Sequence, residues 1–317
     1  MTGFGYNING FGVGSSASVF ERGLFAGGTG RINVIQYIDI ATLGNATDFG
    51  DLSASKDGVS SISNLTRGIF SGGNTGSAIN VIEYITIATT GDVTDFGDLY
   101  AGANRNASQG SINSATRGIV GGGYMTGGTT NIIQYVTIGS TGNSSAFGDL
   151  SAIQYRGYQM GSLSSSTRGV FGGGGDISVD NTVIDYVTIA STGNATDFGN
   201  MSSGRDGSGG CGNSVRGLFL QGYNGDETFS NVIDYITIAS TGNATDFGDV
   251  STASRHSSSC SGPARAVVAA GAGGYPYRSN IMEYVTIAST GNSSDFGDLL
   301  ESQGGRTALS SANGGSV

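Results

Sequence analysis

The chain has 317 residues, a net charge of −10 and an isoelectric point near 4.4, and 58 of its residues are glycine. This acidity excludes the basic stripe that nucleic-acid binding requires. No apolar stretch has the length of a membrane span, and residues 1–10 lack the basic start and apolar core of a signal peptide. Regular Val, Ile and Tyr runs between the glycines argue against disorder, because such runs need a packed partner.

One phrase occurs six times along the chain, and in every copy a Tyr precedes a Phe by 12 residues. The step from one such Tyr to the next is 47 to 51 residues, which is typical of a solenoid, an array or a propeller with one supersecondary unit per copy. We therefore expect a single repeat domain. The recurring aromatic residues are Tyr37, Tyr84, Tyr135, Tyr186, Tyr235 and Tyr284, followed by Phe49, Phe96, Phe147, Phe198, Phe247 and Phe296.

Each copy predicts four short strands in the same order. A Ser-rich strand, such as the one that begins at Gly110, turns tightly at Thr-Arg-Gly into a second strand that ends in glycines. The third strand, such as Asn131-IIQYVTI, is apolar on both faces and must be covered on both. The fourth carries the recurring Phe, as in Asp197-FGNM. Strands joined by Gly, Asn and Ser turns, with no helical period, predict an all-β six-bladed β-propeller of four antiparallel strands per blade.

The first-strand pattern occurs seven times against six copies of the rest, with extra copies near both termini. Propellers avoid an open sheet edge by pairing a strand from one terminus into the blade begun at the other. We expect residues 307–313 to complete the first blade, so that residues 21–317 form one six-bladed propeller. Residues 1–20 would then be a displaced first strand, turned outward or used against a neighbouring molecule.

Most charged residues repeat with the blades and are expected to be architectural. We expect each arginine of the Thr-Arg-Gly turn to meet an acid of the third strand, Glu83, Asp185, Asp234 or Glu283, although Gln36 and Gln134 stand in the same slot. The two cysteines are one repeat apart in a core slot and are expected to be buried free thiols. The turn arginines are Arg22, Arg67, Arg117, Arg168, Arg216 and Arg265; a second basic slot holds Lys56, Arg105, Arg156, Arg205, Arg255 and Arg306.

The search for catalytic chemistry yields no convincing site. His256 is the only histidine and reads as a solvated loop residue, and no Cys/His cluster has zinc spacing. The repeated Asp-Phe-Gly-Asp favours carboxylates that accept backbone hydrogen bonds at a bend over a calcium site. The Asn-x-Ser/Thr triplets at Asn45, Asn143, Asn194, Asn243 and Asn292 read as turn chemistry rather than glycan acceptors. We therefore expect neither catalysis, nor a cofactor, nor a metal.

Sequence variation is confined to two of the four connections in each blade, those between strands two and three and those between blades. Both open on one end of the propeller, and variable loops on a rigid scaffold are the usual place for recognition. Aromatic and basic side chains there are suited to stacking on sugars or gripping protein, although ordinary surface tyrosines are the alternative. The candidate ligand-binding residues are Tyr124, Tyr155, Tyr158, Tyr223, Tyr275, Tyr277 and Arg278.

The order Arg, Gly-Gly, Tyr, bulky aromatic resembles the kelch repeat, with glycine pairs such as Gly27-Gly28 and Gly72-Gly73, but Phe replaces the kelch Trp. The amino-acid sequence from residue 15 to 300 also resembles repeat proteins predicted in phages of marine cyanobacteria. Those proteins are generally taken as virion or tail-fibre components. The resemblance implies a non-enzymatic virion adhesion module, without membrane insertion, that recognises a host glycan or surface protein. The alternative is a purely structural virion protein that contacts other subunits. An enzyme of the galactose-oxidase or glycosidase kind is a third reading, against which the missing His/Tyr metal constellation counts.

Overall fold

The fold is described from a computed structural model. The structure describes residues 21–100, 105–106, 110–125, 128–151, 160–175, 181–224, 228–269, 271–273 and 278–312, and of residues 105–106 and 124–125 it describes the backbone alone. None of these residues lies in a helix. The described residues therefore contain no helix that could span a membrane.

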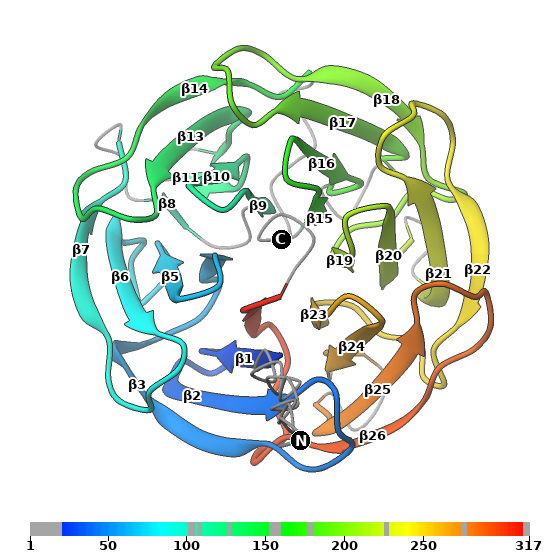
Figure 1. The fold of residues 1–317 in the computed structure, drawn as a ribbon, viewed down its shortest axis with the longest axis horizontal. Helices are drawn as coiled ribbons and strands as arrows, with labels where there is room; N and C mark the ends of the chain where they lie inside the picture. Colours follow the sequence, from blue (N-terminus) through cyan, green and yellow to red (C-terminus); the bar gives the residue numbers. More distant parts are fainter. Residues whose placement is uncertain are drawn as a thin grey trace, which may run out of the picture.

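The described residues form six four-stranded antiparallel sheets arranged as blades around a central axis (Figure 1). The predicted all-β six-bladed β-propeller is therefore confirmed. Blade 1 contains β27 (Thr307–Ser310), β1 (Arg22–Ala26), β2 (Ile32–Asp39) and β3 (Thr47–Lys56); blade 2 contains β4 (Ser60–Ser63), β5 (Arg67–Ser71), β6 (Val81–Thr86) and β7 (Thr94–Asp98); blade 3 contains β9 (Gly110–Asn113), β10 (Arg117–Gly121), β13 (Ile132–Thr137) and β14 (Ser145–Asp149).

The other three blades repeat this order, and a small extra sheet lies outside the blades. Blade 4 contains β15 (Gly161–Ser164), β16 (Arg168–Gly172), β17 (Val183–Thr188) and β18 (Thr196–Asn200); blade 5 contains β19 (Gly209–Gly212), β20 (Arg216–Tyr223), β21 (Phe229–Thr237) and β22 (Thr245–Asp249); blade 6 contains β23 (Ser258–Ser261), β24 (Arg265–Ala269), β25 (Ile281–Thr286) and β26 (Ser294–Asp298). The extra sheet joins β8 (Arg105–Asn106), β11 (Tyr124–Met125) and β12 (Gly128–Thr129).

The ring closes through the C-terminal strand, as predicted. In Figure 1 β27 lies beside β1, and the two pair antiparallel with Leu309 opposite Leu24. The serine hydroxyls of this strand and its neighbours complete the closure. Ser63 Oγ donates to the Ser310 carbonyl at 2.7 Å, and Ser310 Oγ donates to the Ser261 carbonyl at 2.7 Å. The expected displacement of residues 1–20 lies outside the described residues.

The hydrophobic core is divided among the junctions between neighbouring blades, which we call seams. At each seam a first-strand side chain packs against the second strand of the next blade, at the residue that follows the turn arginine. Ile62 lies against Gly118 in this way, and Leu163 lies against Gly217. At seam 5–6 the second-strand residue is Ala266, and the facing side chain, Cys211, is correspondingly smaller. The extra methyl group of Ala266 is therefore matched at seam 5–6 by a smaller facing side chain.

Both cysteines are free thiols in these core slots, as predicted. Burial raises the pKa of Cys211 to about 12 and raises the pKa of Cys260 well above its ordinary value. Since the thiolate is the reactive form and a raised pKa keeps the thiol protonated, both thiols are expected to be unreactive.

Candidate functional site

The turns between strands one and two and between strands three and four lie at one end of the propeller, which we call the constant end. The other two connections of each blade lie at the opposite, variable end, because successive strands are antiparallel. The constant end is built from the repeated phrase, and its interactions are the same at every seam.

At the constant end each turn arginine stacks on the recurring tyrosine and ties its blade to the next. The guanidinium lies 4.2 to 4.6 Å from the tyrosine ring centroid. Its Nη1 donates to an isoleucine carbonyl of the following blade at 2.7 to 3.0 Å, as Arg168 does to Ile238. The tyrosine in turn meets the recurring Phe edge-on, with ring centroids 6.0 to 6.2 Å apart.

The expected ion pair between these arginines and the third-strand acids is wrong, and strand geometry gives the reason. Arg168 is opposite Thr188 in the β16–β17 register. Side chains alternate between the two faces of a strand, so Tyr186 shares the face of Arg168 whereas Asp185 points to the other face. The arginine therefore stacks on the ring and cannot reach the acid.

The Ser-Thr-Gly-Asn turns close the same seams on the outer side. In each copy the turn Asn, or Asp92 in blade 2, accepts a hydrogen bond from the fourth strand of the preceding blade at 3.0 to 3.1 Å. The turn glycine donates its N–H to the recurring Phe carbonyl of that blade at 2.8 to 3.0 Å. These contacts explain the Asn-x-Ser/Thr triplets as packing features. Among the described residues no group of three or more His, Cys, Asp or Glu side chains could hold a metal ion.

The third-strand acids are instead part of the variable end, where they meet cations from the connectors. Lys56 Nζ lies 2.5 Å from Glu83 Oε1 at seam 1–2, and Arg205 Nη2 lies 2.6 Å from Asp234 Oδ2 at seam 4–5. All four side chains are essentially inaccessible to solvent. A buried carboxylate is tolerated there because a buried cation neutralises it.

At seam 5–6 the same position holds Ser254. The carbonyls of Lys56, Arg205 and Ser254 each accept the N–H of the preceding blade's second glycine, Gly28, Gly174 and Gly222, at 2.8 to 3.3 Å. The following residue then pairs with the next blade's loop in the same way at Asp57, Asp206 and Arg255. Arg255 therefore stands one residue outside the slot that its sequence position indicated, and its guanidinium stacks 4.7 Å from the Tyr223 ring centroid.

Arg306 and His256 also occupy positions that the sequence misassigned. Gly305 and His256 take the left-handed backbone, with φ of 63° and 56°, that Gly58 and Gly207 adopt at other seams. His256 is partly buried rather than a solvated loop residue, and burial together with Arg255 lowers its pKa to about 4. Arg306 follows Gly305 and is buried, and none of its guanidinium nitrogens makes a hydrogen bond within the described part of the chain.

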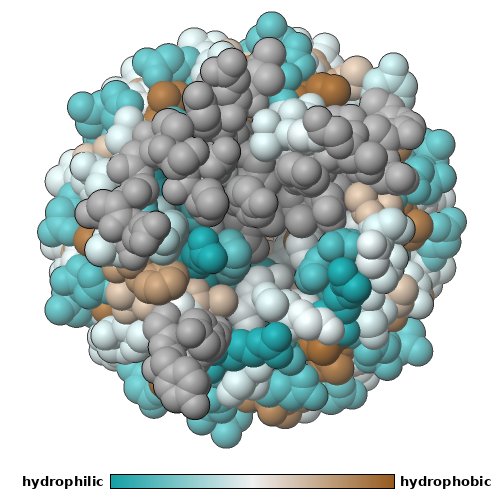
Figure 2. Space-filling view, turned by 180° about the vertical axis from the view of Figure 1, so that it is seen from behind, coloured by the Kyte–Doolittle hydropathy of each residue, from teal (hydrophilic) through white to brown (hydrophobic). Residues whose placement is uncertain are grey.

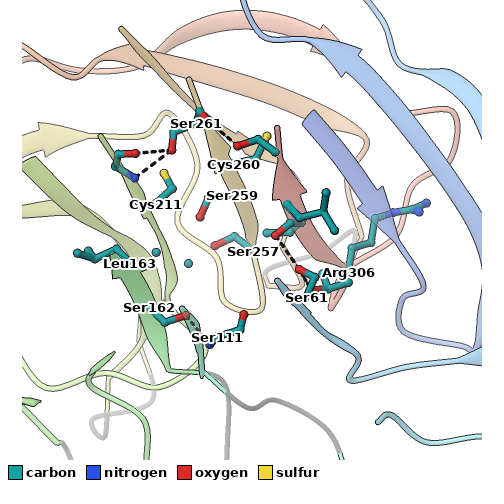
Figure 3. A pocket seen from close by; sticks show the side chains of 18 of the residues that line it. Ser61, Ser111, Ser162, Leu163, Cys211, Ser257, Ser259, Cys260, Ser261 and Arg306 are labelled. Carbon is teal, nitrogen blue, oxygen red and sulfur yellow. Dashed lines mark hydrogen bonds between the residues drawn. The ribbon is translucent and has the colours of Figure 1, made fainter. Parts of the chain in front are cut away.

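The first strands surround a central cavity of about 100 Å³. Figure 3 shows Ser111, Ser162, Ser257 and Ser259, from three different blades, gathered around it, while the Arg306 guanidinium is directed away. The lining is mostly serine and glycine backbone, and the volume is below that of ordinary ligand pockets. The cavity is therefore too small to hold a sugar ring.

A larger cleft of about 390 Å³ opens at the variable end of seam 5–6. It is lined by Gln221, Thr252, Ser254, Arg278, Ile281 and Glu283, among others. Figure 2 shows the side opposite to that of Figure 1, where the coloured surface is mainly hydrophilic with separate apolar spots. Of the candidate ligand-binding residues, Arg278 lines this cleft and is exposed.

Tyr223 lies next to the same seam, but its ring is already engaged. Arg255 covers it, and Phe229 packs at 5.2 Å between ring centroids with an interplanar angle of 59°. Tyr124 belongs to β11, where the backbone alone is described. Tyr155, Tyr158, Tyr275 and Tyr277 lie outside the described residues. The residues that sequence reasoning missed are Gln221, Ser254 and Glu283, which line the cleft as a group.

Searches of protein-family descriptions and of curated proteins find no match to this chain.

Proposed function

We propose that this protein is a non-enzymatic binding module that recognises a glycan or a surface protein through its variable end. The contrast between the two ends supports the proposal best. Identical contacts hold the constant end at every seam, while the variable end carries loops of different content and a cleft of about 390 Å³ at seam 5–6. A rigid scaffold that presents variable loops is a common design for recognition.

A virion or a tail fibre is the location that we propose for this activity. The likeness of the repeat to kelch units, and of its sequence to repeat proteins of marine cyanobacterial phages, supports this proposal. There the protein would act in adhesion to the host surface. Its partners would be a host glycan or surface protein together with other virion subunits, and it would be located on the virion surface.

A glycan array probed with the whole chain tests the proposal. We expect binding to a restricted set of glycans, reduced by Arg278→Ala in the cleft and by Tyr275→Ala, a candidate from the sequence that lies outside the described residues. Leu65→Ser is the matched control, since Leu65 is 48% exposed in a turn of the constant end. Silence across the array, combined with stable binding to another virion protein, would replace adhesion by a purely structural role.

A further inference from the structure

Glu283 at seam 5–6 is a buried carboxylate that has no cationic partner among the described residues. It is 8% exposed, and it accepts hydrogen bonds from the Ser251 N–H at 3.3 Å and from Ser293 Oγ at 3.0 Å. In the corresponding places Glu83 has Lys56 and Asp234 has Arg205. At seam 6–1 the two corresponding positions hold the uncharged residues Gln36 and Gln303, and Gln36 Oε1 accepts the Leu300 N–H of the connector that carries Gln303 at 2.7 Å. Among the described seams, seam 5–6 is thus the one that has the carboxylate, Glu283, but no lysine or arginine at the position of Lys56 and Arg205.

The space that a lysine or arginine side chain fills elsewhere is open at this seam. Ser254 occupies the Lys56 and Arg205 position, and both Ser254 and Glu283 line the 390 Å³ cleft. A volume of that size accommodates a whole sugar ring, whereas one lysine side chain would leave most of it empty.

Two further polar oxygens of the cleft, Gln221 Oε1 and Ser254 Oγ, are buried and form no hydrogen bond with any described residue. Gln221 is 5% exposed, and its Oε1 has no partner while its Nε2 donates to the Thr252 carbonyl at 2.7 Å. Ser254 is 4% exposed and its Oγ has no partner. Buried polar atoms are nearly always hydrogen-bonded, so these two are suited to receive groups of a ligand.

Gln221 also holds a strained backbone conformation. Its φ is 57°, at the position where Gly27, Gly72, Gly122 and Gly173 have φ between 64° and 69°. A side chain at such a position costs stability, and strain of this kind concentrates at functional sites. The residue that replaces the glycine directs a carboxamide to the cleft wall.

From these observations we propose that the cleft at seam 5–6 binds an amino sugar with a free amine, a proposal that rests on the function proposed above. The ligand ammonium would pair with Glu283, in the place that Lys56 Nζ takes beside Glu83. Ring hydroxyls would donate to Gln221 Oε1 and exchange hydrogen bonds with Ser254 Oγ. Ile281, 46% exposed, offers an apolar surface to the C–H groups of the ring. Arg278 lies at the mouth, against Gly30 of blade 1, and would donate to oxygens remote from the amine.

The composition of the cleft favours this ligand over other cations. A hard metal ion needs several oxygen ligands, and the described lining contains a single carboxylate. A lysine side chain from a protein partner would satisfy Glu283, yet it would bring no hydroxyl to Gln221 Oε1 and Ser254 Oγ.

Isothermal titration with glucosamine, glucose and N-acetylglucosamine tests the proposal, because these sugars differ mainly in the amine. We expect glucosamine to bind at least about tenfold more tightly than the other two, as charged hydrogen bonds do over neutral ones. Glu283→Gln should abolish this preference. The variant should fold, since Gln36 and Gln134 occupy the same position in other blades. Asp197→Asn is the matched control, an exposed acid on β18 whose loss should leave the preference unchanged.

Ser254→Lys is the complementary variant, because it transplants the blade 2 lysine into the cleft. The variant should fold and lose glucosamine binding, since the ammonium of the introduced lysine would form the ion pair with Glu283. Equal affinity for the three sugars, or a preference that survives Glu283→Gln, would overturn the inference.

Different results would refute the amino-sugar site and the proposed binding function. Array binding to amine-free glycans that Arg278→Ala weakens and Glu283→Gln leaves intact would keep the function and refute the amino-sugar site. Binding of a lysine-rich peptide that requires Glu283, without sugar binding, would replace the amino sugar by a protein partner.

Discussion

The two ends of the propeller are made from the same twenty-four blade strands, but their seams are built differently. At the constant end the turn arginine, the recurring tyrosine and the turn glycine make the same contacts at all six seams. At the variable end the same two positions hold different residues at the four described seams. Two combinations are ion pairs, Lys56 with Glu83 and Arg205 with Asp234. The other two are Ser254 across from Glu283 and Gln303 across from Gln36.

This difference shows which residues of the repeat can be substituted without loss of the fold. The constant end uses backbone carbonyls and glycines, so a single substitution there has no compensating partner. The variable end uses side chains, which form ion pairs at seams 1–2 and 4–5 and differ in charge at seams 5–6 and 6–1. Specificity is therefore open to change at the variable end without loss of the ring, and the following predictions test this division.

The largest effect is expected for Gly199→Ala at the constant end. A Cβ on Gly199, which has φ of 148°, would run into the Gly242 carbonyl of the next blade, and backbone cannot move aside cheaply. We expect a loss of about 3 kcal/mol or more in the free energy of unfolding, measured by urea denaturation. Gly242→Ala is the matched control, because φ there is 156° and a Cβ would meet nothing within 4 Å. Equal losses in the two variants would show that the close contact does not determine stability.

The features that repeat in every blade could be predicted from the sequence. The spacing of Tyr37 and Phe49 and its five repetitions predict the blades, and the surplus strand at residues 307–310 predicts the closure. The partner of the turn arginine was missed because Asp185 and Tyr186 are adjacent in sequence, and only the cross-strand register assigns them to opposite faces.

The candidate site was missed for a different reason, namely a shift in register within the connectors. Lys56 and Arg205 stand six residues before the core residue of the first strand, Ile62 or Cys211. Counting six back from Cys260 gives Ser254, so the signal was present in the sequence. Aligning basic residues by type selected Arg255 instead. The cleft itself, and the strain at Gln221, depend on three-dimensional packing that no spacing encodes.

The second prediction concerns the buried guanidinium of Arg306. Val59 holds the equivalent position at seam 1–2, directly after the left-handed Gly58. Burial lowers the pKa of Arg306 to about 10, with Glu301 acting in the opposite direction. Folding therefore disfavours the charged form, and this penalty is present at every pH below about 10. We expect Arg306→Val to raise the free energy of unfolding by about 2 kcal/mol, measured by denaturation at pH 7. Destabilisation would mean that the guanidinium is compensated in the native state.

The third prediction separates the two ends by a double-mutant cycle. Arg216→Ala removes the stacking on Tyr235 at 4.6 Å and the bond to the Ile287 carbonyl at 2.7 Å, and should cost about 2 kcal/mol. Combined with Asp234→Asn it should be additive, because the two side chains lie on opposite faces of β21. Arg205→Met and Asp234→Asn should instead couple by more than about 1 kcal/mol. A non-additive change in the free energy of unfolding for Arg216→Ala and Asp234→Asn would contradict this prediction, because it would indicate an ion pair between the two side chains.

The smallest effect at neutral pH is expected for His256→Gly at the variable end. Its φ of 56° is strained for histidine, and glycine stands at this position in three other seams, so the variant should be about 1 kcal/mol more stable at pH 7. The pKa of His256 is lowered to about 4, below the value of the unfolded chain, so the folded state resists protonation. The contribution of His256 therefore lowers the stability of the wild type as the pH falls through 6.5 towards 4, by up to about 1.4 kcal/mol per pH unit, and His256 adds no further pH dependence below about pH 4. The variant should lack this slope, and the difference between the two proteins in thermal unfolding should widen from pH 7 to pH 4.5. A constant difference over this range would mean that His256 titrates normally and that the variable end carries no pH-dependent strain at this seam.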